Sequence, residues 1–243
     1  MTDAHVHMGC LFAKGEFPVD YATVLTVAKC KDALMAGFTT FRDAGSVSEG
    51  LKLAFDEGVL PGPRIYPCGA YISQTCGHGD SEYAHTYRDI QYRHPSSAVL
   101  ADGVPEIIRA VREQFYRGAS HIKLMATEIL NRHEDIGLLF GTDMMITGPD
   151  YQVEQSEDIR YYEKRFGTMR ALRALTGTAN EVFALTTYQN PYPKGKIGVL
   201  EAGSYADLLL VDGDPTKRVS VLADTDHLRL IMKGGTVYKN TLC

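Results

Sequence analysis

Two histidines, at positions 5 and 7, are the first residues of this sequence whose type and spacing suggest chemistry. Side chains alternate between the two faces of a strand, so His5 and His7 in an extended segment would point to the same side. Imidazole nitrogens are common ligands of zinc, and one strand can therefore supply two ligands to one ion. The alternative is a pair of unrelated polar side chains in a flexible N-terminal segment.

Lys123 is the second candidate, because it occurs in an otherwise strand-like segment, residues 121–127. In a strand, Lys123 shares one face with His121 and Met125. Strands of parallel sheets are usually buried on both faces, so a lysine there needs an ionic partner or a chemical role. The alternative is an edge strand, or a lysine whose ammonium group reaches solvent.

Asp143 and His78 complete the set of candidates. Asp143 follows an apolar run at 136–141, and α/β-barrel enzymes place their reacting groups just beyond the C-terminal ends of buried strands. An aspartate in an ordinary turn or at a helix N-terminus is the alternative. His78 lies between two glycines in a predicted loop, where the backbone can approach a ligand closely. The alternative for His78 is an exposed loop histidine.

The composition limits the class of protein. With 44% hydrophobic and 23% charged residues, the 243-residue chain is expected to be a soluble globular protein with a buried core. A net charge of −5 gives no reason to expect nucleic acid or an acidic membrane as a partner. The five cysteines include no CxxC pair, and we find neither an apolar membrane span nor an N-terminal signal. We therefore expect a reducing, cytoplasmic location.

Strand-like and helical patterns alternate along the first part of the chain, which predicts βαβ units and a parallel sheet. For the first helix, the helical period places Val24, Val27, Ala28 and Leu34 on the apolar face, with Lys31 out of place. A break near Gly177 is expected in the last helix, and residues 142–159 are expected to form a loop. The predicted strands are 3–9, 38–45, 61–73 and 121–127, and the predicted helices are 19–37, 47–59, 104–119 and 168–185.

The tail of the chain has a different pattern, rich in turns and strand-forming residues. We expect antiparallel strands between about Lys194 and Asn240, with a hairpin turn at Gly234-Gly235. Residues 205–212 should form the most buried strand, because their centre is an uninterrupted apolar run, and one edge of that strand should be exposed. The predicted domains are accordingly 1–186 and 187–243.

Seven segments occur in the order seen in the amidohydrolase superfamily, and they look closest to its imidazolonepropionase-like and Xaa-Pro dipeptidase-like branch. That family resemblance implies an α/β fold in which a (β/α)8 TIM barrel is joined to a small β-sandwich. The 1–186 segment would be the barrel part and the 187–243 segment part of the sandwich. The segments are DAHVHMG, AGFTTFRDAG, GPRIYPCGAYIS, HIKLMAT, LLFGTD, ALRALTGTANEVFAL and GKIGVLEAGSYADLLLVDGDP.

The resemblance also implies a function for each candidate residue. His5 and His7 would bind the more buried metal, and Lys123, carboxylated, would bridge two metals. Asp143 would ligate a metal and shuttle a proton, and His78 would lie near the substrate. The implied cofactor is one or two divalent ions, which we expect to be zinc, and the implied reaction is hydrolysis of a C–N bond in a small amide or dipeptide. Such a metal lowers the pKa of its bound water to about 7.

The sequence departs from the family between Lys123 and Asp143, which are only 20 positions apart. One βα unit takes roughly 30 residues, so barrel strands five to seven and two further metal-ligand histidines have no counterpart. The N-terminal sandwich strands are not found either. We therefore expect an incomplete barrel with exposed apolar edges, and a homo-oligomer. Three explanations of the shortening are open: a true deletion, an incomplete sequence, or a barrel completed by another copy.

Two functional hypotheses follow from this departure. The first is a metal-dependent amidohydrolase that uses a metal-activated hydroxide. The second is a catalytically inactive remnant of such an enzyme, because two ligand histidines are missing. On the second hypothesis, we expect no measurable dipeptidase activity from the 243-residue chain, even with added zinc.

Overall fold

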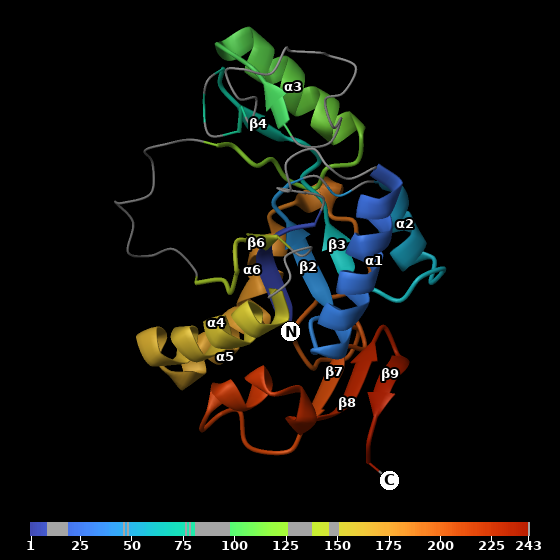
Figure 1. The fold of residues 1–243 in the computed structure, drawn as a ribbon, viewed down its shortest axis with the longest axis vertical. Helices are drawn as coiled ribbons and strands as arrows, with labels where there is room; N and C mark the ends of the chain where they lie inside the picture. Colours follow the sequence, from blue (N-terminus) through green and yellow to red (C-terminus); the bar gives the residue numbers. More distant parts are fainter. Residues whose placement is uncertain are drawn as a thin grey trace.

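The computed structural model describes residues 1–8, 19–45, 47, 49–75, 77, 79–80, 98–125, 138–145 and 151–242. The protein has an α/β fold with a parallel sheet at its centre (Figure 1). The order of the strands in this sheet is β3-β2-β1-β6. These strands are β1 (Thr2–His7), β2 (Thr40–Asp43), β3 (Arg64–Tyr66) and β6 (Met144–Met145).

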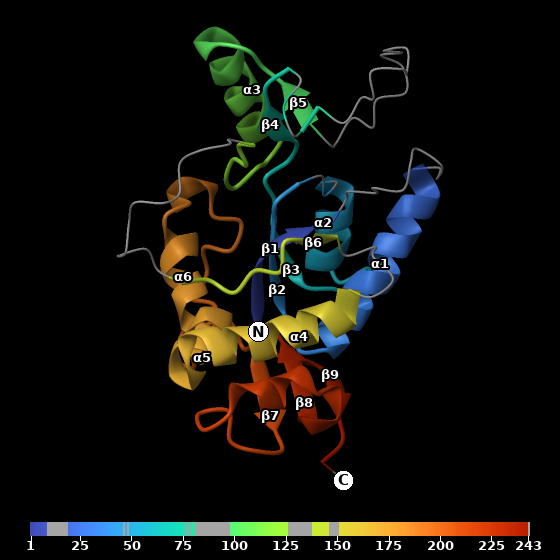
Figure 2. The same cartoon turned by 60° about the vertical axis from the view of Figure 1, so that its left-hand side comes forward.

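The parallel sheet is held in register by pairs such as Thr2–Thr40 and Val6–Met144. Its helices are α1 (Val19–Met35), α2 (Glu49–Asp56), α4 (Tyr151–Phe166), α5 (Thr168–Leu175) and α6 (Gly177–Ala184). Helices α1 and α2 lie on one side of the sheet, and α5 and α6 lie on the other (Figure 2). The core between the layers includes Val6, Phe41 and Phe140, all with no exposed surface.

A second, smaller unit lies beyond the carboxyl ends of these strands (Figure 1). Strand β4 (Tyr71–Ser73) pairs in parallel with β5 (Ala98–Leu100), next to helix α3 (Val104–Tyr116). The single strand that the sequence predicted at 61–73 is therefore two strands in different sheets. The chain turns between them at Gly69 (φ 69°), and the Gln114 side chain accepts a hydrogen bond from the Ala70 amide at 2.9 Å.

The strand predicted at 121–127 is reduced to a short extended pairing within the described residues. Leu124 forms an isolated parallel bridge with Ile72. The Ile72 amide donates to the Lys123 carbonyl at 2.9 Å, and the Met125 amide donates to the Ile72 carbonyl at 3.0 Å. Lys123 is thus held along the free side of β4, where it is half-buried.

Two predictions were wrong: the apolar face of the first helix, and the loop expected at 142–159. Helix α1 forms where expected, but Val24 is 67% exposed and Ala28 is also exposed. Helix α4 covers much of the segment predicted to be a loop, and its sequence is mostly polar, with Ile159 and Gln155 among its buried residues. The buried residues of α1 are Thr26, Cys30, Ala33 and Leu34.

The C-terminal sheet is antiparallel, in the order β7-β8-β9, and lies next to the N-terminus of β1 (Figure 2). The expected turn at Gly234-Gly235 is confirmed. The prediction that 205–212 is the most buried strand was wrong, because β7 is an edge strand and β8 is the centre, with Leu228 and Ile231 fully buried. The strands are β7 (Leu208–Val211), β8 (Leu228–Lys233) and β9 (Thr236–Asn240).

Within the described ranges, the strands form separate sheets of four, two and three strands, and none closes into a barrel. The combination of a parallel sheet with covering helices confirms the predicted α/β class. In the same part of the chain, no helix combines the length and apolar character needed to cross a bilayer.

A buried ion pair joins the C-terminal sheet to the parallel sheet. Arg64 of β3 pairs with Asp207, and their side chains are 6% and 8% exposed. Arg64→Ala should lower the free energy of unfolding by about 3 kcal/mol, because the buried Asp207 carboxylate loses its direct ionic partner. Urea denaturation measures this loss. Lys217→Ala, which removes an exposed partner of Asp214, is the control and should change stability by less than about 1 kcal/mol. Equal effects of the two variants would contradict the prediction.

Candidate metal centre

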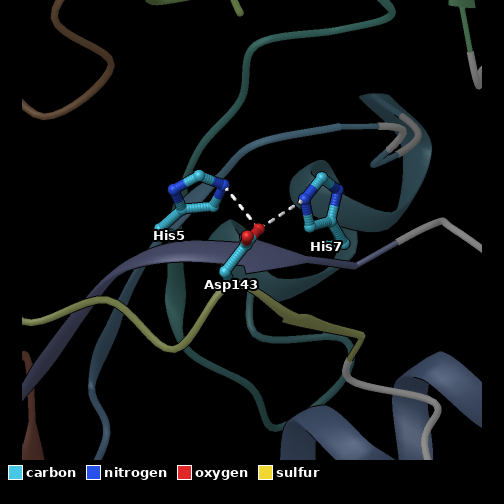
Figure 3. A group of neighbouring side chains, drawn as sticks. All are labelled: His5, His7 and Asp143. Carbon is cyan, nitrogen blue, oxygen red and sulfur yellow. Dashed lines mark hydrogen bonds and ion pairs between the residues drawn. The ribbon is translucent and has the colours of Figure 1, made fainter. Parts of the chain in front are cut away.

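Three candidate ligands meet at the carboxyl end of β1. The Asp143 Oδ1 atom lies 2.9 Å from His5 Nε2 and 3.1 Å from His7 Nε2. One ligand atom from each of the three residues lies within 4.8 Å of the other two. Figure 3 shows both imidazoles on the same side of β1, with the Asp143 carboxylate between them. The predicted alternation therefore holds, and the two histidines face one point.

Lys123 also contacts His5, at the same ring nitrogen that Asp143 contacts. Its Nζ atom lies 3.0 Å from His5 Nε2. The structure thus brings His5, His7, Asp143 and Lys123 together, as the sequence predicted. His78, the remaining candidate, lies outside the described residues.

The backbone places Asp143 differently from the sequence prediction. Asp143 precedes the short strand β6 instead of following a strand, and its φ of 56° is left-handed. This conformation is uncommon outside glycine, although aspartate tolerates it better than most residues. The Asp143 amide donates to the His5 carbonyl at 2.7 Å. The close approach of this segment to β1 also requires glycine at position 141, where a Cβ would lie 2.7 Å from the His5 Cβ.

Two buried carboxylates that the sequence analysis did not single out support this end of the sheet. Asp3 and Asp43 have no exposed surface. Asp43 Oδ1 accepts from the Met8 amide at 3.0 Å, and its Oδ2 accepts from the Val47 amide at 3.2 Å. Burial raises the pKa of each carboxyl group to about 6. Their positions in the sequence could have identified them, because Asp3 shares a strand face with the two histidines and Asp43 is the last residue of β2.

The donor set suits a divalent metal. Two imidazole nitrogens and a carboxylate oxygen are typical zinc ligands, with bonds of about 2.0–2.2 Å. Hydrogen bonds from His5 and His7 hold the pKa of Asp143 well below its usual range, so its carboxylate is anionic at neutral pH. The side chain of Asp143 is 70% exposed and that of His7 only 9%, which leaves one side of the cluster open to a substrate.

The raised pKa of Asp43 predicts a pH-dependent stability. Its folded pKa of about 6 exceeds the unfolded value of about 3.9, so the folded state binds the proton more tightly and loses stability as pH rises from about 4 to 6. Asp43→Asn removes this loss. Relative to the parent, the variant should gain roughly 2–3 kcal/mol between pH 4 and pH 7 in chelator-treated protein. Urea denaturation across this range measures the gain, and a difference independent of pH would contradict the prediction.

Comparison with known proteins identifies the family to which this chain belongs. Residues 1–138 match the model of the amidohydrolase family. The chain belongs to this family, whose members are generally metal-dependent.

Individual relatives agree with that assignment. The chain is 33% identical to ochratoxinase from Aspergillus niger over 147 residues, which cover 52% of this chain and 30% of the relative. It therefore spans less than a third of the length of the curated relatives that it matches. A crystal structure of a prolidase complexed with N-methylphosphonate-L-proline aligns with a TM-score of 0.75 at 20% identity, covering 98% of this chain and 86% of that one. A crystal structure of an amidohydrolase gives a TM-score of 0.80 at 21% identity, covering 100% and 86%. These structures show the shared fold.

Proposed function

We propose that this cluster is the metal centre of a hydrolase that cleaves amide or peptide-like C–N bonds. The observation that supports this most directly is the convergence of His5 Nε2, His7 Nε2 and Asp143 Oδ1 within 4.8 Å of one another. The family match supports the same chemistry. Zinc is the ion that we propose, because nitrogen and carboxylate ligands together suit it.

Each residue has a distinct proposed role. A bound divalent ion would supply water of lowered pKa and polarise the scissile carbonyl group. His5 and His7 would hold the ion from one strand. Asp143, with its exposed carboxylate, would also take the proton of the attacking water and pass it to the leaving amine. Lys123 cannot ligate a cation as an ammonium group, and we propose that its carboxylated form provides an oxygen ligand beside His5.

The proposed substrate is a small amide or dipeptide. The ochratoxinase relative and the prolidase and Xaa-Pro dipeptidase neighbours support a compact substrate with one C–N bond to be cleaved. We place His78 near that substrate. We further propose a partial barrel domain at 1–186, a sandwich segment at 187–243, a homo-oligomer that covers the open sheet edges, and a cytoplasmic location, with neither nucleic acid nor a membrane as a partner.

A second candidate function is metal binding without turnover. Among the described residues, the cluster consists of the imidazoles of His5 and His7, the Asp143 carboxylate and Lys123, and the buried His121 imidazole interacts electrostatically with His5 and Lys123. His5, His7 and Asp143 can hold one ion, and within the described ranges no further histidine, cysteine or carboxylate joins them to form a second group of ligands. The short spacing between Lys123 and Asp143 favours this second candidate, as an incomplete barrel that no longer catalyses.

Metal content separates the two candidates. The purified chain would be saturated with zinc, freed of excess ion by gel filtration, and analysed by elemental mass spectrometry. About two ions per chain would favour the hydrolase, and one ion or a substoichiometric amount would favour the non-catalytic form. A chain that retains no zinc would contradict the proposed metal centre itself.

A further inference from the structure

We propose that Asp3 is a positioning residue, whose carboxylate fixes the segment containing Thr142 and Asp143 against β1. The position of Asp143 between the two imidazoles would then depend on a side chain that touches neither metal nor substrate. The consequence for metal affinity rests on the proposed function, whereas the consequence for the backbone does not.

The Asp3 carboxylate receives hydrogen bonds from both sides of the site. Its Oδ1 accepts from the amides of His5 and Thr142, each at 3.2 Å. Its Oδ2 accepts from Thr142 Oγ1 and from Gln155 Nε2, each at 3.0 Å. An ionised carboxylate offers about four acceptor positions, so this one side chain can serve all four donors. Asp3 has no exposed surface, which strengthens these bonds by excluding water.

The hydrogen bonds to Asp3 hold Thr142, the residue before the left-handed backbone of Asp143. Thr142 is bound to Asp3 through both its amide and its hydroxyl group, and Asp143 follows with a φ of 56°. A left-handed non-glycine residue costs of order 1 kcal/mol or more and persists only when its surroundings impose it. Asp143 is restrained through its carboxylate, which contacts His5 and His7, and through its amide, which donates to the His5 carbonyl, and the bonds between Thr142 and Asp3 add a further restraint.

Helix α4 also contacts the Asp3 carboxylate, through Gln155, which is 1% exposed. Its amide group donates to Asp3 Oδ2, so the carboxylate joins β1, the Thr142 segment and α4. Buried partners of ligating residues typically change metal affinity 10–100-fold when they are removed. We therefore expect Asp3 to affect the geometry of the site in addition to the stability of the fold.

Glu163 provides a matched control for an effect on stability alone. It lies at the other end of α4, and its carboxylate accepts from the Val219 amide at 2.7 Å, the Ser220 amide at 3.0 Å and Thr168 Oγ1 at 2.9 Å. The chemistry matches that of Asp3, but none of these partners belongs to the candidate metal centre. Loss of either carboxylate should destabilise the fold, and only loss of Asp3 should alter the site.

The experiment compares Asp3→Ala, Asp3→Asn and Glu163→Ala with the parent chain by two measurements. Hydrogen exchange of the 138–145 segment, followed by mass spectrometry without metal, reports the backbone. Titration with Co²⁺, followed by visible absorption, reports affinity and ligand geometry. Asp3→Ala should speed exchange at Asp143 at least about 10-fold and weaken Co²⁺ binding about 10–100-fold with an altered spectrum. Asp3→Asn should be intermediate, because its oxygen still accepts from two amides, and Glu163→Ala should match the parent in both measurements.

Parent-like exchange and parent-like Co²⁺ binding in Asp3→Asn and Asp3→Ala would overturn the proposal. If Asp3→Ala does not fold, Asp3→Asn decides by the same criteria. Changes of equal size in Glu163→Ala would overturn it too, since they would show a general loss of stability. Absence of Co²⁺ binding in the parent would refute the proposed metal centre, and the exchange comparison would still decide whether Asp3 holds the Asp143 backbone.

Discussion

Replacing His7 with alanine should weaken zinc binding by at least about 100-fold. The His7 side chain is 9% exposed, and its Nε2 lies 3.1 Å from the carboxylate with which it would share the ion. Even partners outside the direct ligand shell change affinity 10–100-fold, so loss of a direct nitrogen ligand should have a larger effect. A competition titration against a chromophoric chelator measures both affinities at a fixed pH, which matters because protons compete with the metal for imidazole.

The matched control for His7→Ala is His227→Ala. The His227 ring is exposed and contacts the Asp212 carbonyl at 2.7 Å, in the C-terminal part of the chain. Its replacement should leave the high-affinity site unchanged. Equal zinc affinity in the parent and in His7→Ala would show that the histidine pair on β1 does not bind the ion.

The second large effect concerns turnover. On the second candidate function, metal binding without turnover, the 243-residue chain supplied with zinc is expected to hydrolyse no dipeptide at a measurable rate. Hydrolysis requires the full ligand set, the activated water and an aligned carbonyl group together, and loss of one supporting group typically lowers the rate by orders of magnitude. The cluster offers His5, His7, Asp143 and Lys123, and the part of the chain that the structure describes contains no second group of metal ligands beside it.

A panel of dipeptides, assayed for released amino acid, tests this expectation. The comparison variant is Asp143→Asn, which keeps the size of the side chain but removes the charge and the proton acceptor. Turnover that is present in the parent and lost in Asp143→Asn would contradict the expectation. It would show that this chain, alone or as an oligomer, completes a working hydrolase site.

Local patterns predicted the part of the site that depends on one strand. The alternation in β1 placed both imidazoles on one face without knowledge of the fold. The break between α5 and α6 and the hairpin at Gly234-Gly235 also follow from local residue preferences. Glycine and alternating side chains act within a few residues, so a single segment contains the necessary information.

Features that depend on distant partners were not predicted. Helix α4 lacks a strong apolar period, and its buried Gln155 donates a hydrogen bond to Asp3, which lies 152 residues away. The division of 61–73 into two strands is supported by Gln114 from another helix. The left-handed backbone of Asp143 depends on contacts with β1. Hydrophobic periodicity does not report buried polar contacts of this kind.

The separation of β1 from β6 has a consequence for the order of events during synthesis. His7 and Asp143 are 136 residues apart, whereas β1 pairs with β2 through Thr2 and Thr40. At translation rates of about 5–20 residues per second, β1 can pair with β2 roughly five to twenty seconds before Asp143 emerges from the ribosome. The nascent chain therefore presents its two histidines without their carboxylate partner, and closure of the long loop that brings Asp143 to β1 is a late step of folding.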